Sequence, residues 1–189
     1  MKRKTLLLSL LALLPLSTAW ASVEINETNF PDESFRSWVN RQYGSDGLLS
    51  DVEIQSATNI VITSAYDIKN LKGIEYFTEV KSLSYIHHQL TSLDVSKNTA
   101  LNSLRCYQNR IQGTAMDALV QSLPQASDAE MYVISNENEQ NVMTVAQVEA
   151  AKAKGWIPYY TDGEKDENGT VIWKEYAGSD PSDIYSVNP

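Results

Sequence analysis

The segment from Asp46 to Glu53 has the residue types and spacing of the second half of a calcium-binding loop. Asp46, Ser50 and Glu53 would supply oxygen ligands, and a glycine stands at the position of the sharp turn. The first and third ligand positions fall on Gln42 and Gly44, and the loss of two oxygen donors removes most of the affinity for calcium. We therefore expect a degenerate EF-hand-like loop that keeps the helix-loop-helix shape, with a working calcium site as the less favoured alternative.

His87, His88 and Cys106 are the other residues that could bind a metal or act as nucleophiles. Neighbouring histidines on a strand or bend point to different sides, and no cysteine or carboxylate stands at ligand spacing from them. A single cysteine excludes an internal disulfide, and its surroundings favour a buried, inert thiol over a reactive one or an intermolecular bridge. The sequence also has no G-x-S-x-G motif and no phosphate-binding glycine loop. We predict no catalytic residue, no metal and no cofactor.

The apolar positions of residues 80–90 recur in residues 101–111, and this repeat sets the elements that position every other candidate. The second copy reads L-x-x-L-x-C-x-x-N-x-I, the pattern of a leucine-rich repeat. Leu104 and Cys106 would point into the core, Arg105 and Tyr107 would point outward, and Asn109 would close the strand at a turn. His88 matches Asn109 in the first copy, which favours a turn role for it. One such unit cannot bury its own apolar edge, so several must stack.

Weaker copies flank the two clear repeats and extend the predicted stack over residues 57–162. Helical periodicity predicts helices at 116–123 and 145–154, the second with Thr144 as its N-cap and Gly155 as its stop. Parallel strands joined by such crossovers make an α/β fold, a short leucine-rich-repeat solenoid. The first inward residue of each predicted strand is Ile60, Leu83, Leu104, Met131 and Ile157 in turn.

The two ends of the chain differ from this central region. Residues 1–21 combine Lys2, Arg3 and Lys4 with an apolar run too short for a membrane span of roughly 20 residues, and end in Ala-Trp-Ala. We expect a cleaved signal peptide, with an uncleaved anchor as the alternative. Residues 22–56 are predicted as a helical N-terminal cap with a helix opening near Pro31. Residues 163–189 are predicted as a polar turn, a capping strand at 171–176 and a loose tail from 177.

The charge of the mature chain excludes two classes of partner. Removal of the three basic residues of the signal peptide leaves 12 of the 15 Lys and Arg against 24 Asp and Glu, a net charge of about −12. Nucleic-acid binding needs clustered Lys and Arg, and anionic lipid repels an acidic protein. We therefore expect neither nucleic acid nor a membrane surface as the partner.

The outward positions of the predicted strands form two rows that would face solvent together. The first row is Val61, Ser84, Arg105, Tyr132 and Pro158, and the second is Thr63, Ile86, Tyr107, Ile134 and Tyr160. Solenoids bind on such extended strand faces, and tyrosine and arginine are the residues that most often anchor interfaces. The candidate ligand-binding residues are Arg105, Tyr107, Tyr132, Tyr160, Ser84 and Ile86. The alternative is that strands simply favour tyrosine and β-branched residues.

Several segments of the sequence resemble segments of exported leucine-rich-repeat proteins of Bacteroidetes. They are residues 29–32, 47–50, 71–77, 90–101 and 151–156, in the order in which that family has them. The resemblance implies a surface protein of the BspA-like type, some members of which are adhesins. It favours a non-catalytic exported module that binds an extracellular or host protein or glycan, in the periplasm or on the outer surface. A hydrolase or hydrolase accessory module and a structural envelope component are the alternatives.

Overall fold

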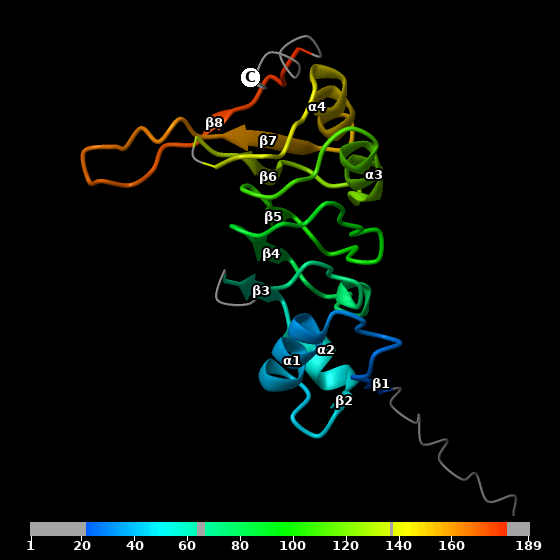
Figure 1. Cartoon of the computed structure of the whole chain (residues 1–189). Helices are drawn as coiled ribbons and strands as arrows, with labels where there is room; N and C mark the ends of the chain where they lie inside the picture. The colour runs from blue at the N-terminus through cyan, green and yellow to red at the C-terminus, as the bar shows by residue number, and fades with distance from the viewer. Residues whose placement is uncertain (1–21, 64–66, 137, 181–189) are drawn as a thin grey trace, which may run out of the picture.

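The computed structural model of the chain describes residues 22–63, 67–136 and 138–180. Within these residues the protein is a mixed α/β structure whose main sheet has the strand order β3-β4-β5-β6-β7-β8. The pairs from β3 to β7 are parallel and follow chain order, and β8 pairs with β7 in the antiparallel direction. Figure 1 shows these strands one above another along the long dimension of the molecule. The predicted signal peptide and the last nine residues lie outside the described part of the chain.

The strands are short and keep one register from turn to turn. Their bounds are β3 Asn59–Ile62, β4 Ser82–Tyr85, β5 Ser103–Arg105, β6 Ala129–Ile134, β7 Trp156–Tyr160 and β8 Lys174–Glu175. Ile60, Leu83, Leu104 and Met131 pair across the sheet in that order, and all four are fully buried. This confirms the first four positions of the predicted inward column. The column forms the centre of one continuous apolar core.

The fifth predicted position of this column is wrong by one residue. Met131 pairs with Pro158, and Ile157 is partly exposed on the opposite side of β7. The reason is Trp156, which is fully buried and whose indole donates a hydrogen bond to the Pro124 carbonyl. Since side chains alternate along a strand, an inward Trp156 also turns Pro158 inward and Tyr159 outward.

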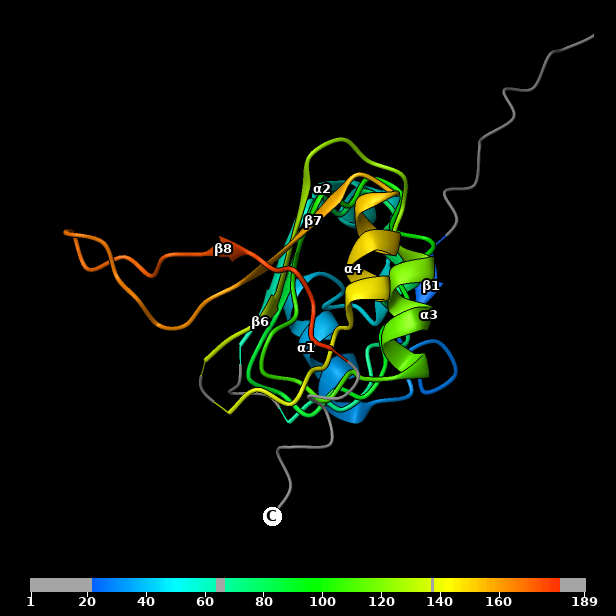
Figure 2. The ribbon, with the colours of Figure 1, turned by 90° about the horizontal axis from the view of Figure 1, so that it is seen from above.

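The return segments on the other side of the core include η1 (Ile74–Tyr76), α3 (Thr114–Ser122) and α4 (Val145–Lys152). In Figure 2, α3 and α4 lie side by side on the side of the sheet away from the long loop before β8. Both helices lie where the periodicity predicts them, and Thr144 caps α4 as predicted, within a capping box. Gly155 has a φ of 81°, and a Cβ there would lie 2.0 Å from the Ala126 carbonyl oxygen, so only glycine fits this turn.

Buried asparagine side chains hold successive turns together at the ends of the strands. The Asn109 amide donates to the carbonyls of Tyr85 and Cys106 at 2.9 Å each. The Asn141 amide donates to the Cys106 and Val133 carbonyls at 2.8 and 3.0 Å. Because the Cys106 carbonyl accepts from both amides, these bonds link three neighbouring strands through groups that would otherwise be buried without partners.

The N-terminal part lies at one end of the sheet, beside β3 (Figure 1). It holds β1 (Val23–Glu24) paired with β2 (Leu48–Leu49), and the helices α1 (Glu33–Gln42) and α2 (Asp51–Ser56). Asp32 caps α1 by accepting a hydrogen bond from the Phe35 N–H, and its other oxygen accepts from the backbone of Lys69 and Asn70. One carboxylate therefore fixes both the start of α1 and the chain that follows β3.

The C-terminal part of the described chain differs from the prediction in two ways. The strand β8 has only two residues, Lys174 and Glu175, where a capping strand was expected over residues 171–176. The predicted loose tail is ordered from 177 to 180, because Ser179 bonds through its backbone to Met143 and Val145 at the start of α4. Between β7 and β8 a loop with an antiparallel bridge from Lys165 to Val171 extends away from the sheet, on the side opposite to the helices (Figures 1 and 2).

Candidate binding surface on the outward strand face

The outward row of the sheet consists of Val61, Ser84, Arg105, Tyr132 and Tyr159, paired in that order. The first four match the predicted row, and Tyr159 takes the place of Pro158. Beyond Tyr132 the register shifts by a β-bulge, so that Ile134 pairs with Tyr160. The bulge leaves the two consecutive tyrosines at the end of β7 both partly exposed.

Tyr132 lies between two flat side chains of the neighbouring strands. The guanidinium carbon of Arg105 is 4.3 Å from the centre of the Tyr132 ring. On the β7 side, Tyr159 stacks on Tyr132 with ring centres 5.3 Å apart and an angle of 23° between the planes. A cation over an aromatic face and an offset stack are both favourable arrangements, so the three side chains hold each other in place.

Trp173, from the loop that precedes β8, and Tyr107, which follows β5, add two more rings. The ring centre of Trp173 is 4.9 Å from that of Tyr132, nearly perpendicular at 85°, and 5.0 Å from that of Tyr107. Next to it, the Lys174 ammonium forms ion pairs with Asp162 at 2.9 Å and Glu164 at 2.7 Å. We call Arg105, Tyr107, Tyr132, Tyr159 and Trp173 the aromatic cluster. Sequence reasoning placed Trp173 in a capping strand and missed its contact with the strand face.

The other predicted ligand-binding residues lie outside this cluster. Ser84 is in the outward row but only 8% exposed, and Ile86 is half-buried. Tyr160 contacts the Tyr176 ring at 5.8 Å. The structure therefore brings together Arg105, Tyr107 and Tyr132 of the predicted set, and adds two rings to them.

The tyrosine hydroxyls of the cluster are hydrogen-bond donors at neutral pH. Burial raises the pKa of Tyr107, with the charge of Arg105 acting in the opposite direction. Burial also raises the pKa of Tyr132, and the hydrogen bond that its hydroxyl donates to Glu130 at 3.0 Å raises it further. Phenols with pKa values above the ordinary value of 10 stay protonated, and the one O–H of Tyr132 is already donated to Glu130, so Tyr132 offers mainly its ring to a ligand.

A hollow of about 440 Å³ adjoins the cluster at the start of β7. Its lining includes Ile157, Ser127, Asp128 and Glu175. Glu175 is the strand partner of Tyr159, so the hollow and the aromatic cluster share one border. The surface therefore combines flat apolar rings with an adjacent concave area whose charged lining is Asp128, Glu175 and Lys152.

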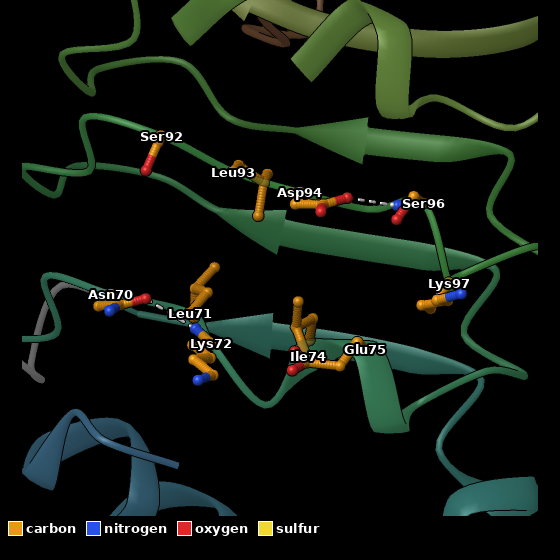
Figure 3. A pocket seen from close by; sticks show the side chains of 10 residues that line it. All are labelled: Asn70, Leu71, Lys72, Ile74, Glu75, Ser92, Leu93, Asp94, Ser96 and Lys97. Carbon is orange, nitrogen blue, oxygen red and sulfur yellow. Dashed lines mark hydrogen bonds between the residues drawn. The ribbon is translucent and has the colours of Figure 1, made fainter. Parts of the chain in front are cut away.

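A second hollow, of about 390 Å³, lies between the return segments that follow β3 and β4 (Figure 3). Three of its polar side chains are used locally: Asn70 accepts from the Lys72 N–H, Glu75 from the Gly73 N–H, and Asp94 from the Ser96 N–H. Such bonds from a side chain to the backbone two residues away are typical of turns. This hollow is thus lined by groups that shape its own walls.

The calcium-loop candidate has a structural role in the described chain. Ser50 is the N-cap of α2, and its backbone N–H and hydroxyl both donate to the Glu53 carboxylate, at 2.7 and 2.8 Å. Asp46 accepts a hydrogen bond from the Leu48 N–H at 3.0 Å. The oxygens proposed as calcium ligands are engaged in a capping box and a turn. Among the described residues, no three His, Cys, Asp or Glu side chains gather closely enough to hold a metal ion.

His88 is partly buried against a core residue, and Cys106 lies in the packed interior. The His88 ring stacks on Tyr85 with centres 4.0 Å apart, and burial lowers the pKa of His88, while hydrogen bonds to the backbone of Ile62 and Thr63 act in the opposite direction. Cys106 is fully buried, as the repeat pattern predicts, and burial raises the pKa of its thiol. In both residues burial therefore favours the neutral side chain.

The fold and this surface define a mixed α/β protein with an aromatic cluster on the outward face of a parallel sheet. No protein-family model matches the chain, and no curated protein sequence matches it. Among solved structures, the functional domain of InlJ from Listeria monocytogenes, described as including a cysteine ladder, is similar with a TM-score of 0.44 and 21% identity. The match covers 60% of this chain and 25% of the InlJ chain, so it spans about a quarter of the length of that solved chain. None of the helices in the described residues is long and apolar enough to span a membrane.

Proposed function

We propose that this protein is a short, exported leucine-rich-repeat solenoid of the BspA-like type that acts as a non-catalytic binding module. The paired inward column from Ile60 to Met131 and the amides of Asn109 and Asn141 support the repeat architecture. In this proposal residues 22–56 cap the first turn, residues 57–162 form the solenoid, and residues 163–189 cap the last turn. The resemblance of the sequence to Bacteroidetes surface proteins supports export by residues 1–21.

The aromatic cluster is the observation that carries the proposed binding role. Its rings contact one another across β5, β6, β7 and the loop before β8, so they are ordered before any ligand arrives. Binding then costs little side-chain entropy, which is the usual advantage of a preorganised surface. Tyrosine, tryptophan and arginine are also the residues enriched at binding hot spots. The ligand is an extracellular or host protein or a glycan.

A double substitution of Tyr107 and Tyr132 by alanine tests this role. We expect binding of residues 22–189 to an array of extracellular matrix proteins and glycans to fall about tenfold or more, because hot-spot rings dominate affinity. The chain should still fold, since both rings lie on the partly exposed face and not in the core. Val61→Ala, in the same outward row but outside the cluster, is the matched control and should bind like the wild type. Equal binding by the double variant would contradict the proposal.

The proposed export has its own test. Native cells should carry the protein without residues 1–21, beginning at Ser22, as N-terminal sequencing of the purified protein would show. Degradation by protease added to intact cells would place it on the outer surface, and degradation only after the outer membrane is opened would place it in the periplasm. A protein recovered from the cytoplasm with Met1 intact would contradict export.

A further inference from the structure

Tyr159 occupies a different position from the other rings of the aromatic cluster, at the border of the hollow. Tyr159 and Ile157 lie on the same outward side of β7 and are both partly exposed, while Trp156 and Pro158 between them are buried. One face of the Tyr159 ring stacks on Tyr132, on the β6 side. The β8 side, towards Glu175 and the hollow, carries no ring contact with another described residue.

Three carboxylates surround this part of the surface. Glu175 is the strand partner of Tyr159, Glu130 is the strand partner of Ile157, and Asp128 lines the hollow. After burial, the negative charges of these three residues raise the pKa of Tyr159 further. Asp128 and Glu175 line the hollow together with Lys152, so the three carboxylates outnumber the one cation among the described lining residues. Carboxylates accept hydrogen bonds and donate none at neutral pH, so a ligand here must offer several donors. Their combined charge repels phosphate, sulfate and carboxylate groups.

A peptide strand does not fit this position. Tyr159 and Tyr160 are paired with β6 on one side and with β8 on the other, and the Pro158 carbonyl accepts from the Tyr176 N–H. Because proline also has no N–H to donate, an extended peptide finds no free sheet edge at Tyr159. The ligand must therefore be recognised by side chains alone, through a ring face and hydrogen-bond acceptors. A sugar ring matches both features. Its C–H groups form a flat apolar face that can stack on the tyrosine ring, and the hydroxyls around its rim donate hydrogen bonds to carboxylates.

We propose that Tyr159 and the hollow beside it bind one ring of an uncharged carbohydrate, an inference that rests on the proposed binding role of the strand face and names its ligand class. The ring stacks on Tyr159, and its hydroxyls donate to Asp128 and Glu175. A hollow of about 440 Å³ lies within the usual range of small-ligand sites, roughly 300–1,000 Å³. The acidic rim selects neutral sugars over sialylated or sulfated ones.

Trp173 provides an optical readout of this site. Of the four tryptophans, Trp20 lies in the predicted signal peptide, and Trp38 and Trp156 are 4% and 0% exposed. Trp173 is partly exposed and contacts Tyr132, the ring on which Tyr159 stacks. A sugar that binds at Tyr159 should therefore change the emission of Trp173.

The test is a titration of residues 22–189 with neutral oligosaccharides of glucose, mannose, galactose, xylose and N-acetylglucosamine, and with sialyllactose and heparin as anionic probes. At least one neutral sugar should bind, and neither anionic probe should bind. Tyr159→Ala should weaken the neutral sugar about tenfold or more, Tyr159→Phe should retain affinity within about threefold, and Val61→Ala should match the wild type. Ser127→Arg, which fills the hollow from an exposed position, should also weaken binding and serves if Tyr159→Ala unfolds.

The outcomes separate this inference from the proposed function. Binding of no neutral sugar, or equal binding by the wild type, Tyr159→Ala and Ser127→Arg, would overturn the inference. If a matrix protein then binds in a manner lost on substitution of Tyr107 and Tyr132, the proposed function stands with a protein ligand. If neither sugar nor protein binds, both fail.

Discussion

Glu139 is the residue whose contribution was least visible in the sequence. Its two carboxylate oxygens accept backbone N–H groups from Gln108 at 2.8 Å, Ser135 at 2.9 Å, Gln140 at 3.0 Å and Asn141 at 2.8 Å. These donors belong to the turns after β5 and β6, so one side chain joins two successive turns. A charged acceptor shared by four backbone donors is among the stronger hydrogen-bonding arrangements in proteins.

Glu139→Gln should lower the free energy of unfolding by about 2 kcal/mol or more. The amide keeps one oxygen and puts an NH₂ group opposite two backbone N–H donors, which leaves those donors without an acceptor. Urea unfolding followed by circular dichroism measures the change. Glu149→Gln, on the exposed side of α4, is the control and should unfold like the wild type. Equal stability of the two variants would show that water replaces the lost acceptor.

Cys106 should resist thiol reagents in the native protein. The side chain is fully buried, and burial raises the pKa of the thiol, so the reactive thiolate is scarce. Titration with a chromogenic disulfide should show no reaction over minutes in buffer and one thiol per chain in denaturant. Rapid labelling without denaturant would mean that β5 opens readily.

His88 should make stability depend on pH. Its pKa is lowered in the folded protein, so the neutral form is favoured, and the stabilisation is complete above the ordinary value of 6.5 and is lost as pH falls below it. Unfolding in urea at pH 7.5 and 5.5 should therefore show a larger loss for the wild type than for His88→Asn. The asparagine places at this turn the side chain that Asn109 has at the next one. His87→Asn, at the exposed neighbour, should keep the wild-type difference.

Among the elements, those in which apolar and polar residues alternate were predictable. A strand without charged or strongly polar residues was not. Leu83 and Leu104 are flanked by polar residues, so alternation fixed the register of β4 and β5. The run from Trp156 to Tyr160 contains no charged or strongly polar residue to mark its outward positions, and its register was predicted one residue out. Asn141 was hidden for a different reason, since it follows β6 after a longer turn than Asn109 follows β5.

The candidate site was partly predictable for the same reason. Arg105, Tyr107 and Tyr132 follow from strand alternation and parallel register, which are local properties. The contact of Trp173 with Tyr132 depends on the path of the loop between β7 and β8, and no sequence periodicity encodes it. The placement of Tyr159 depends on the burial of Trp156. Either Trp156 or Ile157 could point into the core, and packing alone decides between them.

The loop before β8 is held by the ion pairs of Lys174, and its order is expected to depend on them. The hydrogen bond that Lys174 donates to Asp162 lowers the pKa of that carboxyl. Lys174→Met should increase hydrogen exchange across residues 163–173 and leave the melting temperature nearly unchanged, since exposed pairs contribute little to global stability. Lys165→Met is the control on the same loop. Unchanged exchange in Lys174→Met would mean that Trp173 alone fixes the loop.

For the whole molecule, β8 is the element that covers the outer edge of β7. It pairs Tyr159 with Glu175 and Tyr160 with Lys174, and Ser179 continues the cover over the start of α4. A chain truncated after Thr161 loses this cover and exposes an unpaired parallel strand edge, which favours pairing between molecules. Size exclusion with light scattering should show that the truncated protein self-associates more than residues 22–189 do. A monodisperse truncated chain would show that β7 needs no cover.

The arrangement of the strands also has a mechanical consequence. The described ends of the chain lie at opposite ends of the stack, and the strands run across the line that joins them (Figure 1). Tension applied between the ends therefore loads the backbone hydrogen bonds of one strand pair at a time. Neighbouring strands then separate one after another. Each turn of roughly 25 residues would then release about 80 Å of extended chain. A module that is tethered at one end and binds a ligand at the other would lengthen in steps under flow. Each step would lower the peak force on the bound ligand.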